Sequence, residues 1–200
     1  MTTSEVRQHD GQEPLGAGKV LLHFMMSLDG FIADADQDAI SWSEGATFRP
    51  GIAEEYGKSI GAILGGRKGW DAYPVPSAPY GGAMARPVFI LTHHPDDAQP
   101  ADGVTFLDCD VAEAARIALE AAGGQNVAVF SGSIGSQLLE RELIDEIHLH
   151  IVPILLGDGV RLFDNPGGTP IRLELLSGDE PKAVIDVRYR PVASQQGAAF

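Results

Sequence analysis

The sequence predicts one α/β domain: a central, mixed but mainly parallel sheet flanked by helices, with an antiparallel hairpin at its C-terminal end. Apolar runs typical of strands buried on both faces alternate with helical segments through the middle of the chain. Two further runs, joined across SGDE, read as the hairpin. With 200 residues, 44% hydrophobic and 21% charged, the chain can bury one sizeable core. We expect a single domain over residues 19–191, between flexible polar tails at 1–18 and 192–200.

The first strand is predicted in the apolar run KVLLHFMM, Lys19 to Met26, which ends at the turn signal SLDG. A short helix is expected from about Pro50 to Lys58. The next apolar run, AIL, begins at Ala62 and predicts a strand that leads into the glycines of GGRKGW. The β-branched and aromatic content of PVFILT, Pro87 to Thr92, and of VTFL, Val104 to Leu107, predicts two more strands.

A helix follows these strands. Asp110 and Glu113 have the spacing of a capping box, alanines fill the interior, and Gly123 ends it. The apolar run NVAVFS predicts the next strand, at Asn126 to Ser131. A second helix is expected over roughly Ile134 to Glu142.

The last part of the chain is predicted to form three strands. A long one, DEIHLHIVPILLG, starts near Asp145. The two strands of the hairpin are expected at Ile171 to Leu176 and at Ala183 to Tyr189.

The charge balance limits the classes of partner. Acidic residues outnumber basic ones by 28 to 14, and the sequence pI is near 4.6, so the average surface repels phosphates. We expect no nucleic-acid partner, and any phosphate ligand must be bound locally. No apolar run approaches the roughly 18 residues of a membrane span, and residues 1–18 do not resemble a signal peptide. We therefore expect a cytoplasmic protein that does not bind membranes.

Cysteine and histidine give no indication of a metal centre. Cys109 is the single cysteine, which excludes an internal disulfide and a cysteine-cluster site. His148 and His150 share one face of a predicted strand, and His93 and His94 are adjacent, but none has an acidic or cysteine partner at a convincing spacing. We expect no metal.

Two glycine-containing segments could bind an anion beyond the ends of strands. In VFSGSIGSQLL, Val129 to Leu139, a buried strand runs through a serine-glycine turn into a helix, which suits a diphosphate but also suits a simple helix cap. In GGRKGW, Arg67 and Lys68 suit a phosphate monoester, although paired cations after a strand usually belong to a solvated turn and a tryptophan such as Trp70 is usually a core residue. Spacing alone leaves both alternatives open.

These segments resemble a known family. LGGRKGWDAYP resembles the GRKTW segment of dihydrofolate reductases. SLDGFIA, followed by GSIGSQLLERELIDEIHLHIVPILLGDGVRLF, resembles the reductase domain of riboflavin biosynthesis, the C-terminal domain of RibD. The resemblance covers roughly Lys19 to Tyr189. On this basis the chain is identified as a member of the dihydrofolate reductase-like superfamily.

The resemblance implies that NADPH lies across the sheet. The segment that would hold its 2′-phosphate is Gly66, Arg67 and Lys68, and the segment beside the adenosine is Leu91, Thr92 and His93. The turn under the diphosphate would consist of Ser131, Gly132, Ser133, Ile134, Gly135 and Ser136. The residues near the nicotinamide ring would be Met26, Ile32 and Ala33. Asp29 would orient the substrate or relay a proton, although an aspartate before glycine is also an ordinary turn residue.

The function implied is an NADPH-dependent reductase that transfers a hydride to a small pterin, pyrimidine or other conjugated carbonyl or imine. The alternatives are a riboflavin-pathway pyrimidine reductase and a non-catalytic nucleotide-binding module. Riboflavin pyrimidine reductases carry EGG where this chain has SGS, and the pattern around Glu54 departs from the pterin-binding helix of dihydrofolate reductases. The resemblance also implies a homodimer, to which the apolar strand at 147–156 would contribute.

Overall fold

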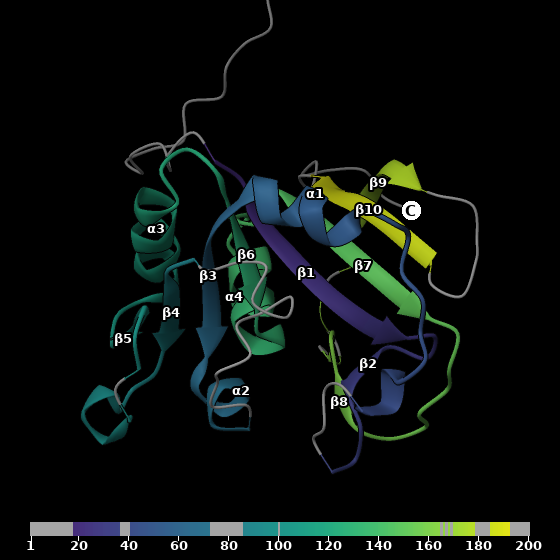
Figure 1. The fold of residues 1–200 in the computed structure, drawn as a ribbon, viewed down its shortest axis with the longest axis horizontal. Helices are drawn as coiled ribbons and strands as arrows, with labels where there is room; N and C mark the ends of the chain where they lie inside the picture. The colour runs from purple at the N-terminus through teal and green to yellow at the C-terminus, as the bar shows by residue number, and fades with distance from the viewer. Residues whose placement is uncertain are drawn as a thin grey trace, which may run out of the picture.

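The computed structural model describes residues 18–36, 41–72, 86–99, 101–164, 166, 168, 170–178 and 185–192. An eight-stranded sheet in the order β5-β4-β3-β6-β1-β7-β10-β9 forms the centre of the fold (Figure 1). The six strands from β5 to β7 are parallel to their neighbours, whereas β10 is antiparallel to both β7 and β9. The bounds of the strands are β1 (Val20–Ser27), β3 (Ile60–Gly66), β4 (Val88–Leu91), β5 (Val104–Leu107), β6 (Asn126–Phe130), β7 (Glu146–Val152), β9 (Arg172–Gly178) and β10 (Ile185–Val192).

A second, two-stranded antiparallel sheet pairs β2 (Phe31–Ala33) with β8 (Val160–Arg161). It lies near the carboxyl end of β1, at the lower edge of the view in Figure 1. The sequence did not predict these strands, because two or three residues are too few to show a periodic pattern.

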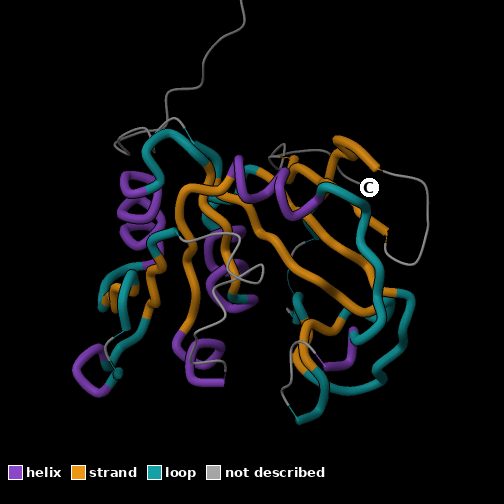
Figure 2. The backbone as a smooth tube through the Cα atoms, in the orientation of Figure 1, coloured by secondary structure: helices purple, strands orange, loops and turns teal. Residues whose placement is uncertain are grey.

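Helices cover both faces of the large sheet (Figure 2). The larger core cluster places α3 (Val111–Ala121) and α4 (Gly132–Glu140) against one face, where Ala115 and Leu138 are fully buried. The other face is covered by α1 (Ile52–Ser59), whose Tyr56 packs in a smaller cluster. The short helix α2 (Arg67–Ala72) follows β3, and single 3-10 turns occur at η1 (Ser41–Ser43) and η2 (Pro95–Asp97).

The structure confirms the predicted α/β architecture and the predicted order of elements. One helix start and one helix cap differ from the prediction for identifiable reasons, and the long strand predicted from Asp145 to Gly157 ends at Val152, because Pro153 has no amide hydrogen to donate. The α4 helix begins at Gly132, two residues earlier than expected, because Ser131 caps it. The capping box of α3 forms only in part: Asp110 accepts a hydrogen bond from the Ala112 amide, whereas Glu113 pairs with Arg116.

The hairpin at the C-terminal end is present, and β9 continues two residues beyond the expected strand, to Gly178. Most of the proposed tails, residues 1–17 and 193–200, lie outside the described residues. Every helix in the described ranges is too short or too polar to cross a membrane.

The structure limits how β7, the long apolar strand, could contribute to a dimer interface. Because β7 lies between β1 and β10, both of its edges are already paired within the chain. It cannot pair with a second copy through a free strand edge. The homodimer itself stays a prediction.

Candidate functional site

The carboxyl ends of β3 and β6 lie side by side at the lower edge of the sheet in Figure 1, while β1 pairs with β6 only through its first residues and runs on beyond it to Ser27. The chain runs outward from β3 to β4 and β5 and then returns to place β6 between β3 and β1. Ligands of open α/β sheets bind at such a change of direction, beyond the carboxyl ends of the strands. The starts of α2 and α4 and the small β2–β8 sheet all lie at this edge.

The glycine turn after β6 joins these parts. Ser131 is the N-cap of α4, and its hydroxyl accepts a hydrogen bond of 3.4 Å from the Ile134 amide. A Cβ atom at Gly66 would lie 2.9 Å from the Ser131 hydroxyl oxygen. A Cβ atom at Gly132 would lie 3.5 Å from Ile32 Cδ1. The structure thus brings together Gly66, the serine-glycine turn and Ile32, which the resemblance assigns to three different parts of one cofactor.

The structure also gives the glycines of this turn a packing role. A Cβ atom at Gly132 would be only 3.3 Å from the Leu162 carbonyl oxygen, so β8 and its turn approach the helix closely here. Gly135 is buried, and a Cβ atom there would come within 2.3 Å of Leu22 Cδ1 in β1. The Ile134 side chain is also buried in the core. Both glycines therefore allow close packing within the protein, and space for a ligand is not the only reason for them.

The two other serines of the turn remain accessible to a ligand. Ser133 is exposed, and its hydroxyl oxygen lies 3.2 Å from that of Ser131. Ser136 is half-buried and is the fifth residue of α4. The first amides of a helix have no partner within the helix, and the helix dipole makes this end positive. Together these groups offer donors to an anion.

Arg67 opens α2 directly after Gly66, but its guanidinium already contacts several acceptors. Nε donates to Asp71 (2.7 Å), and Nη1 donates to Asp97 (2.5 Å) and to the His94 carbonyl (3.1 Å). The hydrogen bonds that Arg67 donates to Asp71 and Asp97 raise the pKa of Arg67. Lys68, the next residue, is exposed. Lys68 is thus accessible to a ligand, whereas the Arg67 guanidinium already has acceptors within the protein. Phosphate binding by these two cations stays a prediction.

The segment assigned to the adenosine follows β4. Leu91 ends this strand and is half-buried, and the Thr92 hydroxyl accepts a hydrogen bond of 3.1 Å from the His94 amide. His93 is 92% exposed and lies 3.7 Å from Asp108. Thr92 thus shapes the turn, and His93 is the member of this segment that solvent and a ligand can reach.

The three residues assigned to the nicotinamide share an apolar environment. Met26 and Ile32 are half-buried and pack against the larger core cluster, and Ala33 is buried in β2. The structure places them on β1 and on the adjacent small sheet, at the same edge as the glycine turn.

Asp29 makes contacts that do not suit a proton relay. Its carboxylate accepts hydrogen bonds from the Ser27 hydroxyl (2.7 Å) and from the amides of Leu156 (3.1 Å) and Gly157 (2.7 Å). Desolvation alone would raise the pKa of Asp29, but these hydrogen bonds outweigh it and lower the pKa to about 2. Asp29 is therefore ionised at neutral pH and anchors the loop after β7. Contact with a substrate stays a prediction.

A buried polar cluster on the α1 face was not predicted. His23 Nε2 and His150 Nε2 are 2.5 Å apart, the His23 ring stacks on Tyr56, and the Tyr56 hydroxyl lies 3.0 Å from His148 Nδ1. His148 Nε2 lies 2.7 Å from Glu146, which also pairs with Lys19. The spacing of His148 and His150 predicted that they share one face of a strand, but it did not predict which side chains they contact. Among the described residues, no group of three or more His, Cys, Asp and Glu is arranged to hold a metal ion.

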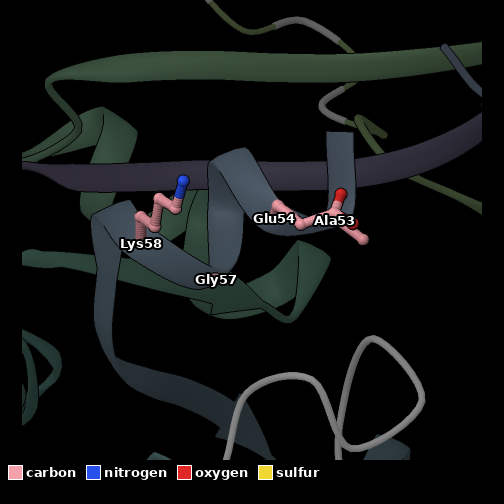
Figure 3. Close-up of a pocket in the computed structure, with 4 residues that line it drawn as sticks. All are labelled: Ala53, Glu54, Gly57 and Lys58. Carbon is pink, nitrogen blue, oxygen red and sulfur yellow. The ribbon is translucent and has the colours of Figure 1, made fainter. Parts of the chain in front are cut away.

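A surface hollow of about 300 Å³ lies elsewhere. Figure 3 shows its lining residues, Ala53, Glu54, Gly57 and Lys58, along α1. In Figure 1 this helix lies near the amino ends of β3 and β6, away from the edge where the glycine turn and α2 meet. The hollow is therefore separate from the candidate site.

Comparison with known proteins decides the family. The family model of the RibD C-terminal domain matches residues 18–180. The chain belongs to the RibD C-terminal domain family. The chain is also similar to the uncharacterised protein YwjB of Bacillus subtilis. The two are 28% identical over 153 residues, which cover 72% of this chain and 82% of YwjB.

Solved structures show the same fold as this RibD-type domain. The diaminohydroxyphosphoribosylaminopyrimidine deaminase/5-amino-6-(5-phosphoribosylamino)uracil reductase of Thermotoga maritima superposes with a TM-score of 0.65 at 17% identity, over 88% of this chain and 57% of that protein. Dihydrofolate reductase of Enterococcus faecalis, in complex with NADP(H), superposes with a TM-score of 0.58 at 14% identity, over 88% of this chain and 98% of that chain. The fold is thus dihydrofolate reductase-like.

Proposed function

We propose that this protein is an NADPH-dependent reductase that acts on a small conjugated carbonyl, imine or heterocycle. The observation that carries the proposal is the convergence of Gly66, the Ser131–Gly132 turn and Ile32 at the carboxyl ends of the strands. Membership of the RibD C-terminal domain family supports a reductase, and the similar fold of an NADP(H)-binding dihydrofolate reductase supports the cofactor.

The residues at this edge suit a dinucleotide. A side chain at Gly66 would collide with the Ser131 hydroxyl, so the glycine keeps this turn of α4 in place at the end of β3. The backbone of that turn would then bind the diphosphate. The amides of Gly132 and Ser133 and the Ser133 hydroxyl would donate to it. Lys68 is exposed at the start of α2 and would face the adenosine ribose phosphate.

When bound, the nicotinamide supplies the hydride. Met26, Ile32 and Ala33 would pack beside the ring and exclude water, which protects a hydride donor from side reactions. Asp29, ionised and bound to the Leu156 and Gly157 amides, would position the loop after β7 at the same edge. The proton that a reduced substrate takes up therefore comes from another group.

Direct binding tests the cofactor assignment. NADPH should bind the wild-type protein more tightly than NADH in calorimetry, and Arg67→Ala should weaken NADPH more than NADH, because charge-assisted hydrogen bonds are worth about 1.5–3 kcal/mol. Lys58→Ala on α1 removes a cation away from the site and is the matched control. Equal loss of both cofactors in Arg67→Ala, or no binding of either to the wild type, would contradict the proposal.

Family membership favours a second candidate, the riboflavin-pathway pyrimidine reductase. Ser131 stands where such reductases carry glutamate, and its hydroxyl is used to cap α4. A short neutral hydroxyl cannot replace the charge or reach of a carboxylate.

A third candidate is a nucleotide-binding module without turnover. Such a protein would bind NADPH but would not oxidise it in the presence of a panel of pterins, pyrimidines and quinones.

A further inference from the structure

Arg67 is one of the two cations that the resemblance assigns to the phosphate on the adenosine ribose, yet the protein itself occupies its guanidinium. Asp71 accepts from Nε at 2.7 Å, and the Asp97 carboxylate accepts from Nη1 at 2.5 Å. The backbone oxygens of His94 and Asp97 lie 3.1 Å from Nη1 and 3.5 Å from Nη2. All three guanidinium nitrogens therefore already have an acceptor.

The topology produces this arrangement. Gly66 and Leu91 are paired in register at the ends of β3 and β4, so the segments that follow these strands start side by side. The first segment begins with Arg67 and carries Asp71 one helical turn later. The second forms η2, which ends at Asp97. The two carboxylates thus approach one guanidinium from different elements.

This arrangement is unfavourable for a third anion. A ribose 2′-phosphate at Arg67 would lie beside the carboxylates of Asp71 and Asp97, and it would have to displace at least one of them. A ribose 2′-hydroxyl has no such conflict, since it can donate a hydrogen bond to a carboxylate, as acidic residues of NAD-binding folds accept from the ribose. Asp97 is the easier of the two to displace, because it lies on another segment and its side chain is 66% exposed.

We propose that Asp97 is a specificity-determining residue that competes with the 2′-phosphate for Arg67 and so limits the preference of this protein for NADPH over NADH. The inference rests on the proposed function, because it requires a dinucleotide at this edge of the sheet. Asp97 would weaken the binding of NADPH, whereas the residues that the resemblance assigns to the 2′-phosphate would strengthen it.

The chain contains its own control. Asp96 precedes Asp97, is equally an exposed aspartate of η2, and makes no hydrogen bond or ion pair with any residue in the described ranges. Asp96→Asn and Asp97→Asn therefore remove the same charge from neighbouring positions, but only Asp97→Asn changes a partner of Arg67. A general effect of net charge would appear in both variants.

The experiment measures dissociation constants of NADPH and NADH by calorimetry, without substrate, for the wild type, the two variants and Arg67→Ala/Asp97→Asn. Asp97→Asn should tighten NADPH binding about tenfold or more and leave NADH within about threefold, because one charge-assisted competitor is lost. Asp96→Asn should change neither cofactor by as much. With Arg67→Ala in the background, Asp97→Asn should no longer favour NADPH.

The outcomes separate the two proposals. Wild-type binding of NADPH with no gain in Asp97→Asn, or an equal gain in Asp96→Asn, overturns the role of Asp97 and leaves the reductase proposal in place. Failure of the wild type to bind either cofactor overturns the proposed function, and the inference with it. Circular dichroism and thermal melting confirm that the variants are folded, and Asp97→Ala provides a second substitution, whose side chain cannot accept from Arg67.

Discussion

The Gly157 amide donates a hydrogen bond of 2.7 Å to the Asp29 carboxylate, across 128 residues of sequence. The same carboxylate accepts from the Leu156 amide and the Ser27 hydroxyl. The Ser27 hydroxyl in turn accepts from the Phe31 amide. One side chain in the turn after β1 therefore fixes both that turn and the loop after β7.

Asp29→Asn should loosen this loop. An amide group can replace one carboxylate oxygen as acceptor, but its NH2 group would face one of the two amide donors, so a hydrogen bond is lost. We expect faster hydrogen exchange at the Leu156 and Gly157 amides, with exchange in β3 and β6 unchanged. Asp102→Asn, at an exposed aspartate before β5, is the control. Unchanged exchange in the loop would show that Asp29 does not anchor it.

The same residue predicts a pH dependence of stability. The folded protein holds the pKa of Asp29 at about 2, below the ordinary 3.8, so the unfolded chain binds a proton more readily than the folded one. The stabilisation is fully present above about pH 4 and is lost as the pH falls through about 2. In urea unfolding across this range, Asp29→Asn should show a smaller loss of stability than wild type. An identical pH dependence in both proteins would contradict the assignment.

Gly135→Ala should destabilise the fold by about 1–3 kcal/mol, the usual cost of overpacking a core. The added methyl group would come within 2.3 Å of Leu22 Cδ1, between α4 and β1. Gly69→Ala in α2 is the control, because a Cβ atom there has no atom within 4 Å and alanine is the better helix former. Chemical denaturation measures both variants. If they unfold alike, close packing at Gly135 is not what excludes a side chain.

Tyr56→Phe should lower the free energy of unfolding by about 1–3 kcal/mol, the cost of losing a hydrogen bond in a buried site. The change removes the hydroxyl that lies 3.0 Å from His148 Nδ1 but keeps the ring that stacks on His23 at 4.0 Å. Tyr56→Ala should cost more, because it also removes the ring. A fully stable Tyr56→Phe protein in urea unfolding would show that the hydroxyl contributes nothing to the cluster.

The branch of the family can be tested with a substrate. We expect no efficient reduction of the ribosylaminopyrimidine phosphate of riboflavin synthesis, because Ser131 replaces the glutamate of EGG and lacks its charge. The measurement follows the nicotinamide absorbance of NADPH with this pyrimidine, using an authentic pyrimidine reductase as the positive control. Turnover comparable to the control would contradict this prediction and would support a role in the riboflavin pathway.

The sequence predicted the elements well where their signals are local. The apolar run of β1, the Asp110 cap and Gly123 end of α3, and the serine-glycine turn before α4 are all readable from neighbouring residues. The same holds for the position of the glycines at the end of β3. Short elements such as β2, β8 and α2 were missed, because two to six residues carry too little pattern.

By itself, then, the sequence determined the order of strands and helices, the family resemblance and the segments that form the candidate site. Only the tertiary structure decided which side chains are available there: Arg67 meets Asp97, Asp29 meets Gly157, and His23 meets His150. Each pair joins residues distant in the sequence. Their contact depends on strand order and register, which arise from packing the whole sheet and which no local periodicity encodes.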